Sequence, residues 1–259
     1  MSTIVTGTHN GVLRIVFNRP DKKNALTVEM YEAINEAFDL AAGDPSIKAL
    51  LFAGEGGTFT AGNDLQDFLA NPPKGEEAPV FQFIRNLAHC PKPMIAAVQG
   101  FAVGVGTTML FHCDMVYAAD DAKFSLPFVN LGLCPEGASS YTLPRIAGYQ
   151  RAAEKLLLGE PFGAEEGEAM GFVNKILPPD QVIAYAARQA EKIAALPAPS
   201  IRAAKMLLKG GKKALDQKAT FERMAEEAEL FQEMLAGPAA REAMSAFLEK
   251  RKPDFSSIE

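Results

Sequence analysis

The sequence predicts an α/β fold in which short strands alternate with amphipathic helices. Val12 to Phe17 is a β-rich run that Asn18-Arg-Pro20 ends, and Ala49 to Ala53 has the composition of a buried strand. Between these runs, Thr27 is placed to cap a helix whose apolar residues recur at helical spacing. Strands separated by helices in this way are typical of α/β proteins.

Further runs extend this pattern and then change it. Met94 to Val98 and Asp114 to Ala119 predict strands, and Lys123 to Ser125 predicts a shorter one. From about residue 180 the chain is Ala-rich, charged and periodic, which predicts helices alone. We therefore divide it into a core with the ligand site, residues 1–195, and a C-terminal helical subdomain, residues 196–259. The C-terminal helices are expected over 181–196, 201–209, 219–236 and 239–251.

The composition excludes several classes of protein. Of the 259 residues, 48% are hydrophobic and 22% charged, which is enough apolar mass for a full core. The net charge of −6 counts against a nucleic-acid partner, which would need a basic face. No run approaches the roughly eighteen apolar residues of a membrane span, and the first residues do not combine a basic with an apolar segment, so we expect neither a membrane span nor a targeting leader. Three cysteines in no disulfide pattern indicate a reducing compartment, so we expect a cytoplasmic protein. From its charge and the lack of a long apolar run, we expect it to bind neither nucleic acid nor membrane.

Glu136 is the one charged residue between Phe124 and Pro144. A carboxylate among apolar residues is costly to bury as an anion, so its pKa should rise, which suits a general base that works near neutral pH. The alternative is an ordinary glutamate in the first turn of a helix that Pro135 starts, facing water. This segment alone favours the second interpretation.

Two glycine-rich loops each follow a predicted strand and lead into a predicted helix. They span Thr58 to Leu65 and Gly100 to Thr108. Small residues let a ligand approach backbone N–H groups, and two N–H groups that converge on one carbonyl form an oxyanion hole worth about 3–4 kcal/mol per donor. The alternative is that the glycines only permit tight turns and close packing.

Other motifs carry weaker signals. Gly104-x-Gly106 lacks the third glycine of a dinucleotide fingerprint. His112-Cys113-Asp114 contains metal-binding residue types, but adjacent side chains diverge, which favours a helix-to-strand junction. We predict no metal site. The glutamates of the C-terminal helices are expected to form a face in water: Glu222, Glu226, Glu227 and Glu229.

Jointly and in this order, four segments resemble the crotonase (enoyl-CoA hydratase/isomerase) superfamily over essentially the whole chain. They are Asn18 to Leu26, Phe59 to Leu65, Ala97 to Gly106 and Phe247 to Phe255. The resemblance implies a crotonase-like spiral of ββα units, a C-terminal helical region that mediates trimerisation, and an acyl-CoA thioester as ligand. Coenzyme A would be part of the substrate, so no separate cofactor is expected. The assembly implied is a homotrimer or a dimer of trimers.

The resemblance also implies roles for individual residues. The oxyanion donors would be the backbone N–H groups of Ala61 and Val105. Met109, Phe81, Phe83 and Phe101 are candidates for the lining of an acyl-tail pocket, but for each of them a place in the core is the favoured interpretation. Residues of the opening segment, of both loops and of the C-terminal segment would bind substrate or coenzyme A: Lys23, Ala25, Gly62, Asp64, Leu65, Gly104, Lys250 and Lys252.

Departures from the family pattern favour an isomerase over a hydratase. Hydratases of the family use two glutamates, and this chain has Thr108 and Phe128 at those positions. Adding water needs one group to activate the water and another to protonate the α-carbon, so efficient hydration is not expected. The segment around Glu136 resembles the one that carries the single base of peroxisomal-type 3-enoyl-CoA to 2-enoyl-CoA (delta3-delta2) isomerases. Glu136 would then be the catalytic base, in fatty-acid or related acyl-CoA degradation.

Two kinds of alternative stay open. Enoyl-CoA hydration or another crotonase reaction, such as epoxide or ring isomerisation or thioester hydrolysis, could use Glu136 differently. The fold also serves as a non-catalytic acyl-CoA- or RNA-binding homologue. The acidic charge counts against RNA, and the two loops with a lone carboxylate count against a silent protein.

Overall fold

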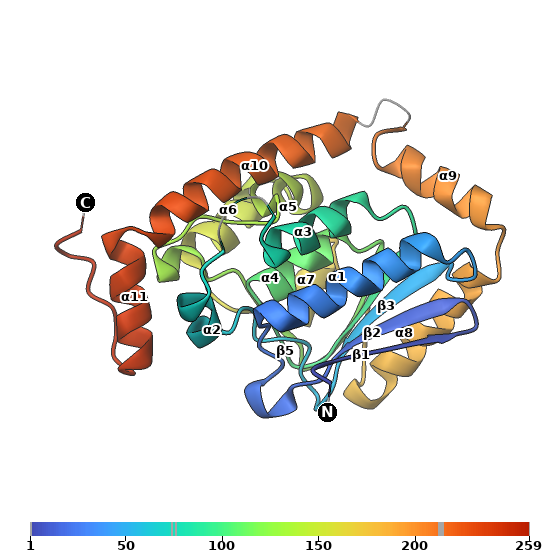
Figure 1. Ribbon diagram of the computed structural model, residues 1–259, viewed down its shortest axis with the longest axis horizontal. Coiled ribbons are helices and arrows are strands. Elements are labelled where there is room, and N and C mark those ends of the chain that lie inside the picture. Colours follow the sequence, from blue (N-terminus) through green and yellow to red (C-terminus); the bar gives the residue numbers. More distant parts are fainter. Residues whose placement is uncertain (1, 74, 76, 212–214, 259) are drawn as a thin grey trace.

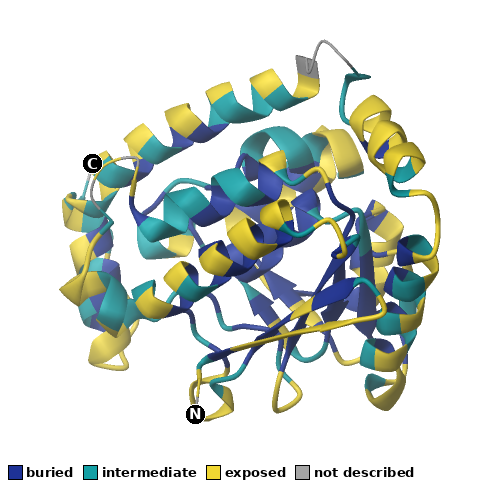
Figure 2. Cartoon of the chain, turned by 45° about the vertical axis from the view of Figure 1, so that its right-hand side comes forward, coloured by how far each residue is buried: buried dark blue, intermediate teal, exposed yellow. Residues whose placement is uncertain are grey.

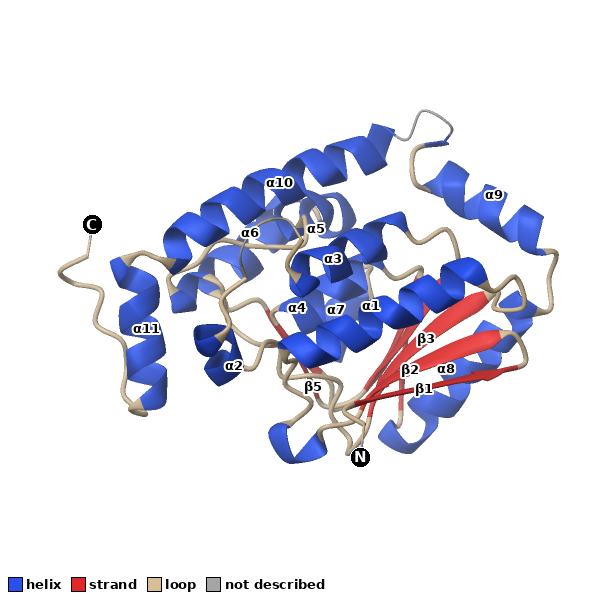
Figure 3. Ribbon diagram, in the orientation of Figure 1, coloured by secondary structure: helices blue, strands red, loops and turns tan. Residues whose placement is uncertain are grey.

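The computed structural model describes residues 2–73, 75, 77–211 and 215–258, and within them the strands form two sheets (Figure 3). In the larger sheet, β1 and β2 pair antiparallel and every other neighbouring pair is parallel. Its strand order is β1 (Ile4–His9), β2 (Val12–Phe17), β3 (Ala49–Gly54), β4 (Met94–Val98), β6 (Met115–Ala119) and β9 (Lys175–Leu177). The smaller sheet contains β5 (Phe101–Val103), β7 (Lys123–Ser125) and β8 (Phe162–Gly163).

The predicted α/β class is confirmed, because parallel strands alternate with helices along the chain. Thr27 caps α1 (Val28–Gly43) as expected, since its side chain accepts a hydrogen bond from the Met30 N–H at 3.4 Å. The chain steps twice from the larger sheet to the smaller one, from β4 to β5 and from β6 to β7. A β-bridge between Thr60 and Ala102 places the two glycine-rich loops next to each other.

Helices cover both faces of the larger sheet. Figure 1 shows α1 and α3 (Pro79–His89) on one face and α8 (Pro179–Ala194) on the other. On the α8 side, Ala186, Ala190 and Ala194 are buried, and these small side chains let the helix lie close to the strands. Figure 2 shows the buried residues concentrated in the strands and in the helix surfaces that face them.

Short helices complete the core and lead into the C-terminal helices. His112 ends a 3₁₀ turn three residues before β6, so His112-Cys113-Asp114 is the helix-to-strand junction that the sequence favoured. The core helices and turns are η1 (Pro20–Lys22), α2 (Leu65–Ala70), α4 (Val105–Thr108), η2 (Met109–His112), η3 (Val129–Leu131), α5 (Ser139–Ala147), α6 (Tyr149–Leu158) and α7 (Ala164–Met170).

The C-terminal region is helical, as predicted, and consists of α9 (Ala198–Leu208), α10 (Leu215–Leu235) and α11 (Pro238–Leu248). Helix α9 begins at Ala198 rather than at the expected residue 201, because Pro199 lies in its first turn, where a missing N–H costs nothing. The long helix α10 crosses the molecule and contacts α3 and α5 (Figure 1). The division at residue 195 stays a prediction. No helix in the described part of the chain is both long and apolar enough to cross a membrane.

Candidate active site

A cavity of about 630 Å³ lies between α2, α3 and α10. Glu136 and Gly137 form part of its wall, together with Asn63 of the first glycine-rich loop. The rest of the lining is largely apolar, so the cavity suits an apolar group rather than a charged one. Apolar side chains come from α2 (Phe68), α3 (Phe81, Ile84) and α10 (Phe221, Met224, Phe231).

Glu136 is buried in the wall of this cavity, with 9% of the residue exposed. The Thr108 hydroxyl donates a hydrogen bond to its Oε1 at 2.6 Å, and its buried Oε2 has no partner among the described residues. Burial raises the pKa of Glu136 to about 7, and the nearby charge of Glu227 adds to this, while the Thr108 hydrogen bond opposes it. Glu136 can therefore both take and return a proton near neutral pH.

The segment around Glu136 is not the start of a helix. Helix α5 begins at Ser139, and both Gly137 (φ +69°) and Ala138 (φ +55°) adopt the left-handed conformation. This tight turn directs the chain inward before α5 begins. The interpretation of Glu136 as a water-facing residue in a helix started by Pro135 is therefore wrong.

Two buried side chains hold this turn in place. His112 donates from Nε2 to the Gly137 carbonyl at 2.7 Å, and burial lowers the pKa of His112 to about 4, so the ring is neutral. Glu227, from α10, accepts hydrogen bonds from the N–H groups of Ala138 at 2.6 Å and Ser140 at 3.1 Å.

The prediction that Glu227 faces water is wrong, since only 4% of the residue is exposed. Glu222, Glu226 and Glu229 are exposed as predicted. The sequence did contain a signal for Glu227. Glu227 lies three residues after Met224 and four before Phe231, both buried. This spacing places all three on the side of α10 that faces the core.

The two glycine-rich loops lie side by side. The Thr60 N–H donates to the Phe101 carbonyl at 2.9 Å, and the Val103 N–H donates to the Thr60 carbonyl at 3.1 Å. Gly62 has φ +84°, and a Cβ there would lie 2.6 Å from the Val103 carbonyl oxygen. A Cβ on Gly106 would meet the Thr60 side chain at 2.5 Å. Some of these glycines therefore do serve close packing, which brings the loops together.

The loop N–H groups differ in their partners. The Ala61 N–H donates to the Lys23 carbonyl at 2.9 Å, which counts against the prediction that Ala61 is an oxyanion donor. Two residues on, the Asn63 N–H has no acceptor among the described residues, and Asn63 lines the cavity. Val105 is the first residue of α4, so its N–H has no partner within that helix.

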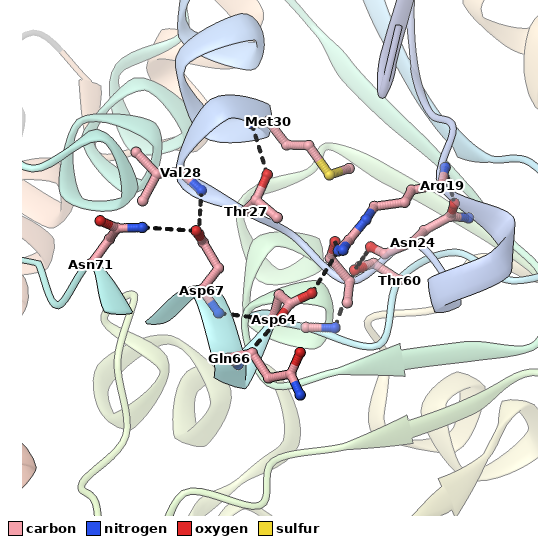
Figure 4. A network of polar contacts seen from close by, with 12 residues as sticks. Arg19, Asn24, Thr27, Val28, Met30, Thr60, Asp64, Gln66, Asp67 and Asn71 are labelled. Atoms are coloured by element: carbon pink, nitrogen blue, oxygen red, sulfur yellow. Dashed lines mark hydrogen bonds and ion pairs between the residues drawn. The ribbon is translucent and has the colours of Figure 1, made fainter. Parts of the chain in front are cut away.

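An ion pair fixes the first loop to the segment before α1 (Figure 4). Arg19 donates to Asp64 Oδ2 at 2.7 Å and to the Ala25 carbonyl at 3.0 Å. The other Asp64 oxygen accepts from the Gln66 N–H at 3.0 Å and caps α2, whose first residue is Leu65.

The other predicted binding residues fall into two groups. The Ala61–Lys23 bond and the Arg19 contacts described above bring together the first group, which contains Lys23, Ala25, Gly62, Asp64 and Leu65. Gly104 directly precedes Val105 in the second loop. Lys250 and Lys252 lie after α11 and are exposed, with no described contact to the first loop.

The remaining sequence candidates also have defined places. Phe81 lines the cavity, Met109 and Phe83 are core, and Phe101 is exposed with the Lys23 ammonium 5.0 Å from its ring centre. Within the described residues, no three His, Cys, Asp or Glu side chains gather as a metal site.

Comparison with known proteins identifies the family. Residues 7–258 match the model of the family described as enoyl-CoA hydratase/isomerase. The chain belongs to this family. It is 38% identical over 214 residues to enoyl-CoA delta isomerase 2 of Homo sapiens, covering 80% of this chain and 54% of the human protein. It is 32% identical over 258 residues to 2,3-dehydroadipyl-CoA hydratase of Escherichia coli strain K12, covering 98% and 99%.

A solved structure confirms the fold of the family. The crystal structure of an enoyl-CoA hydratase/isomerase from Pseudoalteromonas atlantica T6c matches with a TM-score of 0.92 at 37% identity, covering 98% of this chain and 100% of that one. The chain spans about half the length of the delta isomerases it matches. The resemblance to the crotonase superfamily and its fold is therefore confirmed.

Proposed function

We propose that this enzyme shifts the double bond of a 3-enoyl-CoA to give the conjugated 2-enoyl-CoA, with Glu136 as its single base. The observation that carries the proposal is the buried Oε2 of Glu136, which has no partner among the described residues and lies in the wall of an apolar cavity. By the resemblance to the family, Thr108 and Phe128 stand at the positions of the hydratase glutamates, and neither side chain can act as an acid or base near neutral pH. Moving a double bond needs one base, whereas adding water needs a second group.

The reaction is a proton transfer between two carbons. Ionised Glu136 takes a proton from C2, and the electron pair of the broken C–H bond delocalises through the C3–C4 double bond and the thioester carbonyl. The product of this step is a dienolate with negative charge on the thioester oxygen. Protonated Glu136 then delivers the same proton to C4, and the double bond is left between C2 and C3. A pKa of about 7 suits both halves of this transfer.

The backbone N–H groups of Asn63 and Val105 are the oxyanion donors in this proposal, with Asn63 in place of Ala61. Two observations support this choice of donors. The Asn63 N–H has no acceptor among the described residues, and Val105 lies at the start of α4. The Tyr31 hydroxyl donates to Asn63 Oδ1 at 2.5 Å and so fixes the Asn63 side chain at the cavity wall. Two preorganised donors would contribute about 3–4 kcal/mol each to the stability of the dienolate.

The rest of the substrate follows from the same placement. The apolar cavity would hold the acyl chain, and the segment from Lys23 to Ala25 with the first loop would hold coenzyme A. Lys250 and Lys252 remain proposed contacts to its phosphates, and a homotrimer remains the proposed assembly.

The test is turnover of 3-hexenoyl-CoA, followed by the ultraviolet absorbance of the conjugated thioester. Wild-type protein should convert it, and Glu136→Gln should lose at least a hundredfold in kcat, since general base catalysis contributes about 10²–10⁴-fold. Glu222→Gln is the matched control, because Glu222 is exposed and lies outside the cavity lining.

Two results would contradict the proposal. Turnover by Glu136→Gln at the wild-type rate would exclude Glu136 as the base. Hydration of crotonyl-CoA at a rate comparable to isomerisation would favour the hydratase alternative, which the likeness to 2,3-dehydroadipyl-CoA hydratase keeps in view.

A further inference from the structure

Glu227 connects the C-terminal helix α10 to the turn that carries Glu136. Its Oε2 accepts from the Ala138 N–H at 2.6 Å, and its Oε1 accepts from the Ser140 N–H at 3.1 Å and the Ser140 hydroxyl at 2.5 Å. Ala138 is two residues after Glu136, while Glu227 lies 89 residues after Ala138 in the sequence. A buried carboxylate that accepts three hydrogen bonds forms a specific tertiary contact, unlike a glutamate on the surface.

These bonds answer a specific need of the turn. The first N–H groups of a helix have no partner inside the helix, and α5 begins at Ser139. The residue before it, Ala138, is in the left-handed conformation and has no side chain with which to cap the helix. Glu227 supplies the missing acceptor from another helix, and its negative charge suits a helix N-terminus.

We propose that Glu227 is a positioning residue for the reaction, which fixes the turn that carries Glu136 and places a second negative charge beside the base. This inference rests on the proposed function, in which Glu136 is the base. The charge makes it harder for Glu136 to ionise, so Glu136 stays able to hold the proton between C2 and C4. The direction agrees with the raised pKa of Glu136, to which Glu227 contributes after burial itself.

Other charged or titratable groups face this pair and bear on its behaviour. Burial raises the pKa of Glu227, whereas its three hydrogen bonds and the charge of Arg223 lower it. Arg223 is in turn paired with Glu226 at 2.9 Å. The remaining groups near the pair are Tyr31 from α1, His112 from η2, Cys134 from the preceding loop, and Arg85 and Glu229 on the cavity wall.

The decisive variant is Glu227→Gln, which keeps the shape of the side chain and removes its charge. The readouts are the pH dependence of kcat/KM for 3-hexenoyl-CoA and the titration of the Glu136 carboxyl by carbon-13 NMR, assigned with Glu136→Gln. We expect the midpoint of both to move to lower pH by up to about one unit, because removing a neighbouring negative charge favours the ionised form of Glu136. Glu233→Gln, an exposed charge removal on the same helix, should leave the midpoint unchanged.

A lower kcat in Glu227→Gln with an unchanged midpoint would overturn the proposal, because a purely structural contact produces that result. Glu227→Asp keeps the charge but shortens the side chain, so we expect a wild-type midpoint with reduced kcat. Unchanged kcat in Glu227→Asp would show that the three hydrogen bonds do not position the base. If wild-type protein lacks isomerase activity, the proposed function fails, while the NMR titration still decides the effect of Glu227 on Glu136.

Discussion

Replacing Thr108 with valine should lower the fraction of Glu136 that is ionised, and so able to take a proton, at neutral pH. The Thr108 hydroxyl donates the hydrogen bond that Glu136 receives, at 2.6 Å, and it favours the ionised carboxylate. Valine has nearly the same shape as threonine but donates nothing. The ionised form of Glu136 then loses its donor inside a buried site, so the pKa of Glu136 should rise further.

The size of the effect follows from the hydrogen bond. A bond to a charged group contributes about 1.5–3 kcal/mol, and 1.36 kcal/mol corresponds to one pKa unit, so the rise should be about one to two units. From a starting pKa of about 7, the ionised fraction at pH 7 would fall from about one half to about 1–10%. We therefore expect kcat/KM at pH 7 to fall about 5–50-fold, with most of the loss recovered near pH 9.

The assay is the pH profile of kcat/KM for 3-enoyl-CoA isomerisation between pH 5 and 10. Thr108→Ser is the matched control, because it keeps the hydroxyl and should keep the midpoint. A midpoint of Thr108→Val that stays in place or moves to lower pH would refute this account of the Thr108–Glu136 bond. Glu227→Gln should shift the same midpoint in the opposite direction.

Three further variants test the cavity and the scaffold. Ala228 is half-buried on the cavity wall. The Ala228→Phe variant should have a kcat/KM about tenfold lower for dodecenoyl-CoA and little changed for hexenoyl-CoA. Equal losses for the two substrates would contradict the assignment of the acyl chain to this cavity. Gly62→Ala should lower the free energy of unfolding in urea by about 2–4 kcal/mol, because its Cβ would meet a backbone carbonyl, whereas Gly57→Ala, with a similar positive φ but open space, should cost only about 1 kcal/mol. Lys205→Met should cost about 3 kcal/mol in the same measurement, since it leaves Asp114 without the ion pair that joins them at 2.7 Å; a loss below 1 kcal/mol would show that the pair is dispensable.

The strands and helices were largely predictable because their signals are local. The run from Val12 to Phe17 and the cap at Thr27 need only neighbouring residues to be recognised, and both were confirmed. The conformation of the segment at Glu136 was not predictable in this way. Two successive left-handed residues replace the helix that Pro135 suggested, and they depend on contacts from η2 and α10, which lie far away in the sequence.

The candidate site shows the same division between local and distant information. Glu136 stood out as the single charge in an apolar segment, and its burial confirmed the unusual environment. The choice between Ala61 and Asn63 as oxyanion donor depends on which of the two N–H groups bonds to the Lys23 carbonyl. The two residues lie two positions apart in one loop, and only the folded structure shows that the bond belongs to Ala61. Glu227 was hidden among neighbouring glutamates, although its place on the side of α10 that faces the core marked it.

The bond between Glu227 and Ala138 sets an order of events during synthesis. The ribosome makes the turn with Glu136 well before it makes α10. In a nascent chain the left-handed residue Ala138 would therefore wait with its N–H uncapped, and the cavity would lack the wall that α10 provides. The proposed catalysis would therefore depend on α10, which supplies both Glu227 and part of the cavity wall and is made after the turn that carries Glu136.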